Sequence, residues 1–575
     1  MGNNKVDSSA IRRAAPRRTV QVHFPDGLTF EGPIGTPLAA FIQAAYPDIE
    51  PPIMAALVDG VLRDCSHPIT QDVHARPIDT STNNGMRIYQ RSLSFVLVVA
   101  ARELYPEARI IIDHSVTLGG FFCQVEGRPA FDDRELARIE ARMREIVAAD
   151  EPITRETVPV ETAISLFASQ GYDDKVRLLR WREEEHVIVN CLRGVRDYFY
   201  GYLAPSTGLL RWFSLERYPP GFVLRLPQRF APTQLPVAPH YPKLMAVYQE
   251  YRQWQRLLDV EDVGSLNEAV ADGRIRQAVL ISEALHEKNI AAIADRVVQK
   301  RETLGSGCLL VLIAGPSSSG KTTFARRLAI QLLANGLRPF ALGLDDYFVD
   351  RELTPRDASG EYDFEALEAI NLPLFNEHLV ALMAGQRVRL PRYDFKSGRS
   401  ALGEEVQLDR DTILLVEGIH GLNPHLILDV KPERVFRIYV SALTQLNIDH
   451  HNRVPTTDTR LLRRIVRDAR SRGYDAQDTI RRWESVRRGE ERNIFPYQEN
   501  ADVMFNSALV YELAVLKPFA EPLLLHVPEG TMESLEARRL LAFLHWVRPC
   551  APDLVPDNSL LREFIGGSIL EDFAF

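Results

Sequence analysis

The sequence predicts an α/β protein whose largest part is a parallel sheet flanked by helices. The clearest sign is a wholly apolar run, Leu309–Ala314, followed by a glycine-rich stretch and an amphipathic run, Phe324–Leu333. Two further strand-like runs follow, Phe340–Leu344 and Thr412–Val416. Short apolar runs are typical of strands buried on both faces, and strands that alternate with helices favour a parallel sheet.

The glycine-rich stretch is a candidate phosphate-binding loop. Residues 315–322, GPSSSGKT, fit the pattern G-x-x-x-x-G-K-[ST]. The glycines let successive backbone N–H groups face an anion, and the N-terminus of the following helix adds positive potential. An ordinary Gly/Ser turn is the alternative, which the flanking strand and helix disfavour. The residues expected to contact nucleotide phosphates are Gly315, Ser317, Ser318, Ser319, Gly320, Lys321, Thr322 and Thr323.

Two acidic residues stand directly after predicted strands. Asp345 follows the run that ends at Leu344, and Glu417 follows the run that ends at Val416. In open α/β sheets, the carboxyl ends of the strands face the ligand crevice. The sequence can therefore place both acids near the phosphates. One carboxylate can accept the proton of an attacking hydroxyl, and the other can hold Mg²⁺ together with the Thr322 hydroxyl.

Arginines cluster between residues 460 and 492. Four of them recur at helical spacing, and seven more follow: Arg460, Arg463, Arg464 and Arg467, then Arg470, Arg472, Arg481, Arg482, Arg487, Arg488 and Arg492. A solvated helix surface could carry such a run. Because the acids of this segment are too few to pair with every arginine, we expect a mobile lid that closes on a triphosphate.

Composition narrows the class of protein. The chain of 575 residues has a formal net charge of −9, which argues against nucleic-acid binding over the whole surface but not against a local basic patch. Its five scattered cysteines suit a reducing cytosol. No apolar run approaches the roughly 18 residues of a membrane span, and the basic N-terminus lacks the apolar core of a signal peptide. We expect a cytoplasmic protein without a membrane partner.

The chain is expected to comprise six segments. They are a disordered basic tail (1–18), a small α/β domain (19–80), a larger α+β domain (87–226), a Pro-rich linker with a helical connector (227–303), the domain with the phosphate loop (304–528) and a helical extension (529–575). Within the small domain, Thr36 is expected to cap a helix that starts at Pro37 and runs through Tyr46.

Residues 304–528 resemble the uridine kinase and phosphoribulokinase family of P-loop kinases. The matching segments are GPSSSGKTT (315–323), LDDYF (344–348), YDF (362–364), LPRYDF (390–395), LLVEGIHGL (414–422), RLLRRIVRDARSRG (460–473) and ENADVMFN (499–506). The resemblance implies a P-loop NTPase fold that uses ATP and Mg²⁺. It implies Asp345 as the general base for a nucleoside 5′-hydroxyl, with Lys321, Arg467 and Arg472 at the phosphates.

The same resemblance assigns the remaining site residues. Glu417 and Thr322 would hold Mg²⁺, Phe364 and Tyr393 would contact the base, and Arg464 and Glu365 would contact the ribose. Glu365 stands where uridine-cytidine kinases carry Asp. Three more positions depart from them: Gly398 replaces a base-reading histidine, Tyr474 an arginine and Arg482 a glutamine. We expect 5′-phosphorylation of a uridine- or cytidine-like nucleoside in nucleotide salvage, with another base or another hydroxyl compound left open.

The front half resembles two modules of threonyl-tRNA synthetases. Residues 19–80 resemble the TGS domain, and residues 87–226 resemble the second additional domain, through RSLSFVLVVAARELYPEARIII (91–112), GGFF (119–122) and PSTGLLRWF (205–213). The editing histidines of that domain fall on Arg91 and Phe95, and Val195 follows Cys191 where histidine is needed, so we expect no editing chemistry. His114, His186 and Cys123 are expected in the core or at the surface, and His450 with His451 in the lid or at the surface.

The order of these modules resembles a bacterial nucleoside kinase family, as does LLREFIGGS (560–568). Two other hypotheses stay open. In one, the protein is an RNA-associated switch whose front modules bind tRNA or ribosome, although nucleic acid is not the favoured partner. In the other, the front modules support regulation or homo-oligomerisation.

Overall fold

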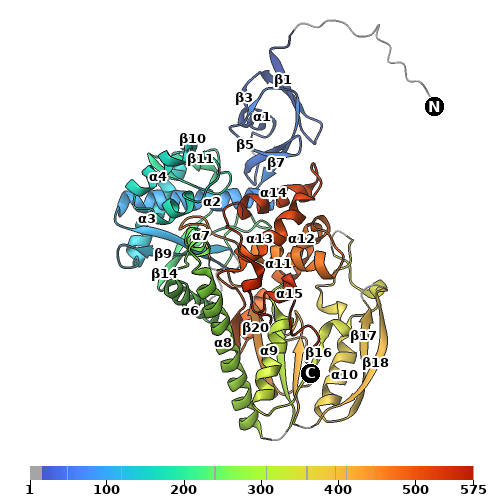
Figure 1. Cartoon of the computed structure of the whole chain (residues 1–575). Helices are drawn as coiled ribbons and strands as arrows, with labels where there is room; N and C mark the ends of the chain where they lie inside the picture. Colours follow the sequence, from blue (N-terminus) through green and yellow to red (C-terminus); the bar gives the residue numbers. More distant parts are fainter. Residues whose placement is uncertain are drawn as a thin grey trace, which may run out of the picture. The chain divides into compact units, whose positions relative to one another are not determined.

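A computed structural model describes residues 16–47, 49–117, 119–237, 241–305, 307–357, 360–394, 397–409, 411–444 and 446–573 (Figure 1). The chain divides into two compact units. Unit 1 comprises residues 1–109, 125–156 and 188–236, and unit 2 comprises residues 110–124, 157–187 and 237–575. Residues 1–15 of the expected basic tail lie outside the described residues. The six-segment organisation stays a prediction.

Unit 1 begins with the small α/β module that the sequence predicts. Its five-stranded sheet has the order β2-β1-β7-β4-β5, and β1 pairs antiparallel with β2 but parallel with β7. The strands are β1 (Thr19–His23), β2 (Thr29–Pro33), β4 (Ile53–Val58), β5 (Val61–Asp64) and β7 (Val73–Asp79), with β3 (Thr36–Pro37) paired to β6 (Pro68–Ile69). Helix α1 (Leu38–Ala45) packs Leu38 and Phe41 against this sheet.

The predicted cap of α1 is wrong. Thr36 belongs to β3, and the N-cap position is taken by Pro37, which has no side-chain hydrogen bond to the helix. The Thr36 hydroxyl instead donates to the Pro33 carbonyl, 2.8 Å away. Because Thr36 is paired with Ile69 in β3 and Pro37 takes the N-cap position, the helix begins at Leu38, one residue later than expected.

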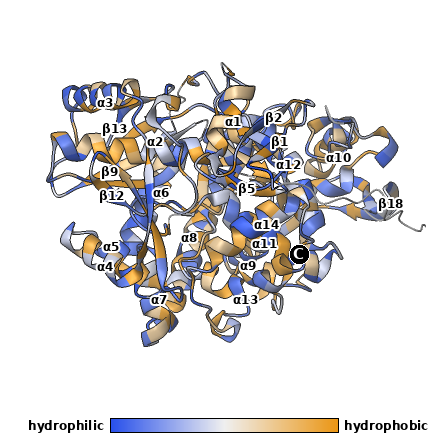
Figure 2. Cartoon of the chain, turned by 90° about the horizontal axis from the view of Figure 1, so that it is seen from above, coloured by the Kyte–Doolittle hydropathy of each residue, from blue (hydrophilic) through white to orange (hydrophobic). Residues whose placement is uncertain are grey.

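Two helices dominate the rest of unit 1. Helix α2 (Asn83–Leu104) begins directly after Thr82, which caps it and accepts from the Gly85 N–H. Helix α3 (Asp133–Ala148) starts with a capping box between Asp132 and Glu135. Figure 2 shows hydrophobic and hydrophilic residues alternating along α3, as its buried positions require. The remaining elements are β12 (Val195–Asp197), β13 (Ser214–Tyr218), β14 (Gly221–Arg225) and the 3₁₀ turn η2 (Thr207–Leu209).

The phosphate loop belongs to unit 2, whose five-stranded sheet is wholly parallel. Its order is β16-β19-β15-β20-β21. The strands are β15 (Leu309–Ala314), β16 (Pro339–Gly343), β19 (Ile413–Glu417), β20 (Val435–Ser441) and β21 (Val503–Asn506). All residues of the central strand β15 are buried, as its apolar run predicts. The predicted P-loop sheet is confirmed.

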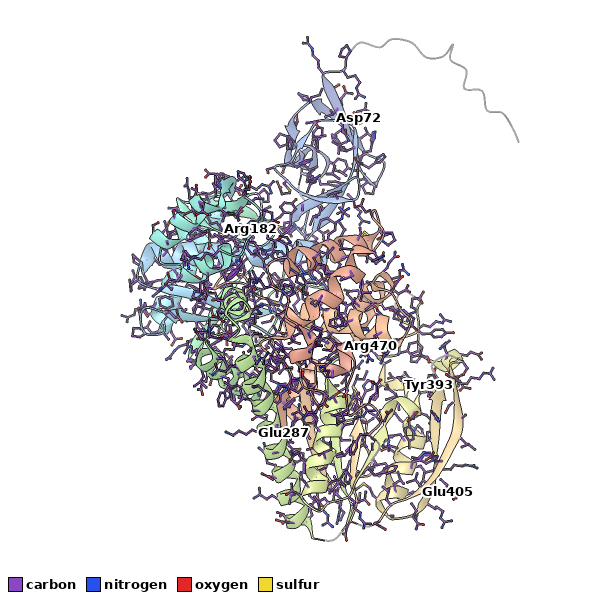
Figure 3. The ribbon with its side chains drawn as sticks, viewed as in Figure 1. Asp72, Arg182, Glu287, Tyr393, Glu405 and Arg470 are labelled. Atoms are coloured by element: carbon purple, nitrogen blue, oxygen red, sulfur yellow. The ribbon has the colours of Figure 1, made fainter. Side chains whose placement is uncertain are left out.

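Helices cover both faces of this sheet. On one face α8 (Ile275–Leu304) and α9 (Lys321–Ala334) run side by side (Figure 1) and pack against β15. On the other face, α10 (Leu372–Met383) packs Phe375 and Leu379 against the opposite side chains of the same strand. An antiparallel ribbon of β17 (Arg387–Asp394) and β18 (Arg399–Gln407) follows α10; Figure 3 shows Tyr393 towards one end of it and Glu405 farther along.

The remaining helices of unit 2 surround the arginine cluster and the C-terminus. They are α6 (Pro242–Leu258), α7 (Val263–Asp272), α11 (Thr456–Ser471), α12 (Ala476–Asn493), α13 (Glu512–Leu525), α14 (Met532–Leu544) and α15 (Arg562–Ile565). Short 3₁₀ turns are η3 (Leu344–Tyr347), η4 (Arg351–Leu353), η5 (Leu367–Ala369), η6 (Pro432–Arg434), η7 (Phe495–Asn500) and η8 (Pro552–Leu554). In the described part of the chain, no helix combines the length and apolarity that crossing a bilayer requires.

Two segments of the synthetase-like region belong to unit 2. The first segment, residues 110–124, holds most of β8 (Arg109–Val116) and β9 (Gly120–Glu126). The second segment, residues 157–187, carries the helices α4 (Val160–Ser169) and α5 (Asp173–Leu179). These helices follow β10 (Thr154–Pro159) and precede β11 (His186–Leu192). Here Lys175 Nζ and Asp449 Oδ1 form a fully buried ion pair at 3.0 Å. The expected lid or surface position is wrong for His451, which is buried with its ring 5.3 Å from that of Tyr172.

Candidate active site

The phosphate loop connects β15 to α9 as the sequence predicts. A side chain at Gly315 would overlap the Val440 carbonyl oxygen, so only glycine allows the loop to pass this close to β20. Gly320 has a φ of +85° and stands directly before α9. Lys321 Nζ curls back and donates to the Pro316 carbonyl at 3.1 Å. The first turn of α9 and the lysine thus lie where a phosphate would be bound.

Glu417 lies beside this loop at the end of β19. Its register neighbours are Ile313 of β15 and Gly343 of β16. Glu417 Oε1 accepts a hydrogen bond from Thr322 Oγ1 at 2.9 Å. Burial is the largest cause that raises the pKa of Glu417 to about 7, and Lys321 opposes it.

The residues here fit a magnesium ion. Carboxylate and hydroxyl oxygens are the ligands that Mg²⁺ prefers, and Thr322 and Glu417 already bring one of each together. No group of three or more His, Cys, Asp or Glu side chains is arranged to hold a metal in the described residues. A Mg²⁺ ion in a phosphoryl-transfer site takes most of its ligands from water and phosphates, so two protein oxygens suffice.

Asp345 lies in η3, directly after β16. Its side chain is accessible to solvent but sits in a recess among protein atoms. This desolvation raises the pKa of Asp345, whereas the charges of Lys321 and Arg472 lower it. Asp345 in turn raises the pKa of Glu417. The structure therefore brings the two predicted carboxylates and the loop lysine within one electrostatic neighbourhood.

The candidate acceptor residues gather around an aromatic side chain that the sequence analysis did not single out. The Phe348 ring lies 6.0 Å from the Phe364 ring and 5.5 Å from the Tyr393 ring. Phe348 thus connects the two predicted base contacts. Phe348 belongs to the LDDYF segment and stands three residues after Asp345, and this position is the sequence feature that could have identified it as a site residue.

Glu365 has an unusual environment. Its side chain packs on α12, where a Cβ at Gly489 would overlap it. Its Oε2 is buried and has no hydrogen-bond partner among the described residues. Burial is the main cause that raises the pKa of Glu365 to about 7; Glu490 also raises it, and Arg464 lowers it. A buried carboxyl oxygen without a partner is suited to bind a polar group of a ligand.

The predicted phosphate and ribose arginines lie together on α11 and just after it. Arg464 Nη1 donates to Ser317 Oγ of the phosphate loop at 2.8 Å. The Asp468 carboxylate forms ion pairs with three guanidinium groups, those of Arg464, Arg467 and Arg472, with N–O distances of 3.2, 2.8 and 3.7 Å. Burial lowers the pKa of both Arg464 and Arg472. Arg464 therefore faces the loop directly.

The expectation of unpaired arginines is wrong. Ten of the eleven have an acidic partner within the described residues. The pairs are Arg460–Glu490, Arg463–Glu512, Arg464, Arg467 and Arg472 with Asp468, Arg470–Glu571, Arg481 with Asp478 and Glu533, Arg487–Glu491, Arg488–Asp357 and Arg492–Asp363. Arg460 and Arg463 are fully buried, so part of the expected lid is a packed core.

Two acidic residues that contact the phosphate loop were not predicted from the sequence. Glu490 of α12 is buried, accepts from the Ser317 N–H at 3.0 Å and pairs with Arg460. Glu563 of α15 accepts from Thr323. Glu490 sits in the segment RRGEERN, which is typical of an exposed charged helix, and it gives no sign of burial.

The three departures from the uridine-cytidine kinase pattern have structural counterparts. Gly398 has a φ of +71°, and a Cβ there would come within 2.8 Å of the Arg351 guanidinium carbon. Arg351 thus fills the space that a longer residue would take. Arg482 stacks over the Tyr474 ring at 4.1 Å, so these two residues contact each other.

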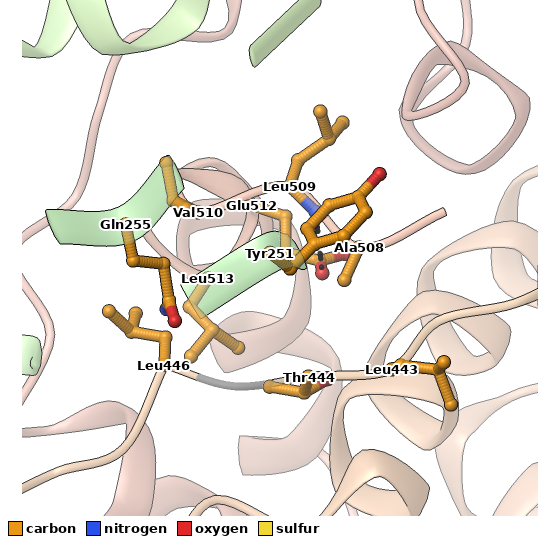
Figure 4. Close-up of a pocket in the computed structure, with 10 residues that line it drawn as sticks. All are labelled: Tyr251, Gln255, Leu443, Thr444, Leu446, Ala508, Leu509, Val510, Glu512 and Leu513. Atoms are coloured by element: carbon orange, nitrogen blue, oxygen red, sulfur yellow. Dashed lines mark hydrogen bonds between the residues drawn. The ribbon is translucent and has the colours of Figure 1, made fainter. Parts of the chain in front are cut away.

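A small cavity lies between α6 and the segment that follows β21 (Figure 4). Its volume is about 20 Å³, and its lining includes Tyr251, Thr444, Ala508 and Glu512. Glu512 Oε1 accepts from the Leu509 N–H at its edge. This volume holds a single water molecule at most, so the cavity is not a nucleotide site.

Arg91 and Phe95, which stand where the synthetase domain carries its first editing histidines, make structural contacts here. Arg91 donates to the Tyr202 carbonyl at 2.6 Å, and the buried Phe95 ring lies 5.1 Å from that of Phe199. The two histidines and the cysteine that were expected in the core or at the surface lie there. His114 is buried and stacked 3.6 Å from the Tyr248 ring, Cys123 is buried, and His186 is exposed on β11.

The solved structures found to be similar give only weak likenesses. A protein from Silicibacter sp. TM1040, described as a kinase of a fructose transport system, is 22% identical, with 38% of this chain and 98% of that chain covered and a TM-score of 0.27. D-glycerate 3-kinase from Cryptococcus neoformans var. grubii is 15% identical, with 44% and 87% covered and a TM-score of 0.20. These TM-scores are too low to support an argument.

Sequence comparison gives a likeness for each half of the chain. The N-terminal region is similar to threonine–tRNA ligases: 30% identical over 197 residues to that of Symbiobacterium thermophilum and 27% over 198 residues to that of Francisella tularensis subsp. tularensis. Each match covers 34% of this chain, and the chain spans only 30% and 31% of those relatives' length. In the other half, residues 310–514, which hold the loop, both carboxylates and the arginine helices, match the model of the Phosphoribulokinase / Uridine kinase family.

Proposed function

We propose that this protein is a P-loop kinase that transfers the γ-phosphoryl group of ATP to a hydroxyl of a small compound. The observation that carries the proposal is the position of Asp345 and Glu417 at neighbouring strand ends beside Lys321 and Thr322. The family match of residues 310–514 supports the same chemistry. The finer proposal is that the acceptor is a uridine- or cytidine-like nucleoside, phosphorylated at its 5′-hydroxyl in nucleotide salvage in the cytoplasm.

The proposed mechanism gives each residue one task. Asp345 accepts the proton of the acceptor hydroxyl, whose oxygen forms a bond to the γ-phosphorus of ATP while the bond to the β,γ-bridging oxygen breaks and ADP leaves. Lys321, Arg467 and Arg472 stabilise the negative charge on the transferred group. Thr322 and Glu417 would hold Mg²⁺, which neutralises phosphate charge and orients the triphosphate when bound.

Binding of the acceptor is proposed to use the cluster around Phe348. Phe364 and Tyr393 supply apolar surface for a planar ring, and Glu365 supplies a carboxyl oxygen for a sugar hydroxyl. The glycine at position 398 leaves no side chain to read the base, and Arg351 fills that space. The site therefore favours a nucleoside-like shape without fixing which base is accepted.

A nucleoside panel with ATP and Mg²⁺ tests the proposal. Formation of a nucleoside 5′-monophosphate and ADP from at least one member is expected, and no product from any member would contradict it. The variant D345N should lose phosphoryl transfer yet keep ATP binding, because the amide cannot act as a base but keeps the size of the side chain. Undiminished turnover by D345N would remove Asp345 as the base.

Two other functions remain as competing proposals. An RNA-associated switch is favoured only by the likeness of the N-terminal region to threonine–tRNA ligases. Filter binding with tRNA at low and high salt separates it from the kinase: tight, salt-sensitive binding would support it. Phosphorylation of another small hydroxyl compound, such as a sugar, would appear as ADP release with that compound and none with nucleosides. Homo-oligomerisation through the front modules would appear as a multiple of the chain mass in light scattering.

A further inference from the structure

The segment Ser559–Gly567, here called the C-terminal strap, lies directly on the phosphate loop. Leu560 is fully buried, and its methyl group occupies the space that a Cβ at Gly320 would need. The Arg463 guanidinium lies 5.0 Å from the Phe564 ring. Arg470, labelled in Figure 3, donates to the Glu563 carbonyl at 3.1 Å. The strap is therefore bound to both the loop and helix α11.

The strap places a carboxylate on donors that the proposed function assigns to ATP. Glu563 Oε2 accepts from Thr323 N–H at 3.2 Å and from Thr323 Oγ1 at 2.8 Å. Thr323 stands in the first turn of α9, where the free N–H groups and the helix dipole attract an anion. Gly320, the residue before this helix, has no side chain to cap it. A carboxylate of the chain itself thus takes the place of a phosphate oxygen.

The charge of Glu563 also acts on the neighbouring Glu417 carboxylate. Glu563 raises the pKa of Glu417 by repulsion, so both acids lie close to the region that a triphosphate would enter. ATP and Glu563 cannot both accept from the Thr323 N–H and hydroxyl. An incoming phosphate would meet the repulsion of two carboxylates unless Glu563 moved away.

The ends of the strap allow such a movement. Ser559 donates to the buried Glu283 and accepts from the Leu561 N–H, which anchors the beginning of the strap. Gly566 and Gly567 at its end have φ values of +89° and +73°, in the region where glycine is unstrained. Between the anchor and these glycines, Leu560 and Phe564 are fully buried, so a strap that leaves the loop must expose them.

We propose that Glu563 mimics a nucleotide phosphate, so that the C-terminal strap competes with ATP for Thr323 and is displaced when ATP binds. This inference rests on the proposed function. It makes the affinity for ATP depend on a residue 240 positions away in the sequence. Any partner or ligand that holds the strap on the loop would inhibit the kinase, and one that draws it away would activate it.

Equilibrium titration with a fluorescent ATP analogue tests the competition. The full-length wild type is compared with E563Q, which keeps the shape but removes the charge, and with E563A, which removes both. The analogue should bind about tenfold more tightly to E563Q, because a charge-assisted hydrogen bond to the occupied donors is lost. The matched control is E571Q. Glu571 is exposed, and its Oε1 lies 3.9 Å from Nη1 of Arg470, the arginine that also contacts the strap. The affinity of E571Q for the analogue should equal that of the wild type.

Hydrogen exchange of the strap provides a second readout that needs no variant. ATP should accelerate exchange of the amides between residues 560 and 566 in the wild type. Unchanged or weaker binding by E563Q, or strap amides that ATP protects further, would overturn the inference. If the wild type binds the analogue and E563Q shows no gain, only the inference fails. If neither binds it, the proposed function fails as well.

Discussion

Thr322 Oγ1 lies 2.9 Å from Glu417 Oε1, and this hydrogen bond joins the first turn of α9 to the last residue of β19. The two residues are 95 positions apart in the sequence. They meet because β15 and β19 are parallel neighbours, so the loop after one strand and the acid that ends the other lie at the same edge of the sheet.

Replacing Glu417 by glutamine should weaken the use of Mg²⁺. The amide keeps the size of the side chain but removes the negative charge that attracts the cation. We expect E417Q to require about tenfold to 100-fold more Mg²⁺ for half-maximal activity, in line with the loss of an oriented metal ligand. The measurement is ATP turnover against Mg²⁺ concentration at saturating ATP.

The control for E417Q is D409N. Asp409 is an exposed acid that pairs with the exposed Arg338, so its loss removes one charge without touching the site. D409N should follow the wild-type Mg²⁺ curve. If E417Q also followed it, Glu417 would have no part in holding the metal.

The buried Arg460–Glu490 pair should be important for stability. Glu490 binds Arg460 at 2.7 Å and also accepts from the Ser317 N–H, while both side chains are almost completely buried. Removing one partner of a buried pair typically costs about 3–5 kcal/mol because a charge is left without compensation. We expect E490Q to lower the free energy of unfolding in urea by about 3 kcal/mol.

The same helix offers a matched control for E490Q. Glu491 pairs with Arg487 at the partly exposed surface. Exposed pairs contribute about 0–1 kcal/mol, so E491Q should change the unfolding free energy by less than that. Equal effects of the two variants would mean that the buried pair does not stabilise the fold as described.

The sequence predicts the sheet and the loop well because both depend on local signals. A short apolar run followed by glycines and an amphipathic run can form little else than a buried strand, a loop and a helix. Asp345 and Glu417 could be found because their strands end at the same edge of the sheet. Phe348 lay within a matched segment and needed only the fold to show its place between Phe364 and Tyr393.

The charge pairs could not be predicted because their partners are distant in the sequence. Arg463 pairs with an acid 49 positions later, and Thr323 meets Glu563 across 240 positions. From its sequence alone, an arginine-rich helix that faces solvent cannot be distinguished from one whose arginines pair with acids on another helix. Only the packing of α11 against α12 and α13 distinguishes a buried ion-pair network from a mobile lid.

Gly489 should be required for the position of Glu365. A methyl group on Gly489 would overlap the Glu365 side chain, so G489A must push that carboxyl out of place. Overpacking of this kind typically costs 1–3 kcal/mol, and we expect KM for the acceptor to rise about tenfold while KM for ATP changes little. Initial rates with the acceptor found in the nucleoside panel measure both constants.

E491A on the same helix is the control for G489A, since its side chain pairs at the surface and does not meet Glu365. It should leave both constants unchanged. An unaltered acceptor KM in G489A would show that Glu365 does not contact the acceptor, whatever its burial.

The raised pKa of Glu365 predicts how stability depends on pH. Burial holds the pKa at about 7 in the folded protein, against an ordinary value of 4.5. Between these two values the folded state binds more protons at this site than the unfolded state does. The contribution of the Glu365 carboxyl to the free energy of unfolding is therefore fully present below about pH 4.5 and is lost as the pH rises through about 7.

The variant E365Q removes this titration while keeping the shape of the side chain. Relative to E365Q, the wild type should lose unfolding free energy steadily as the pH is raised from about 5 to about 8, as measured by urea unfolding at each pH. E361Q, which removes an exposed acid four residues earlier, controls for net charge. A difference between wild type and E365Q that stayed constant across this range would mean that Glu365 is already ionised in the folded protein. Its buried Oε2 would then need a compensating partner that the described residues do not supply.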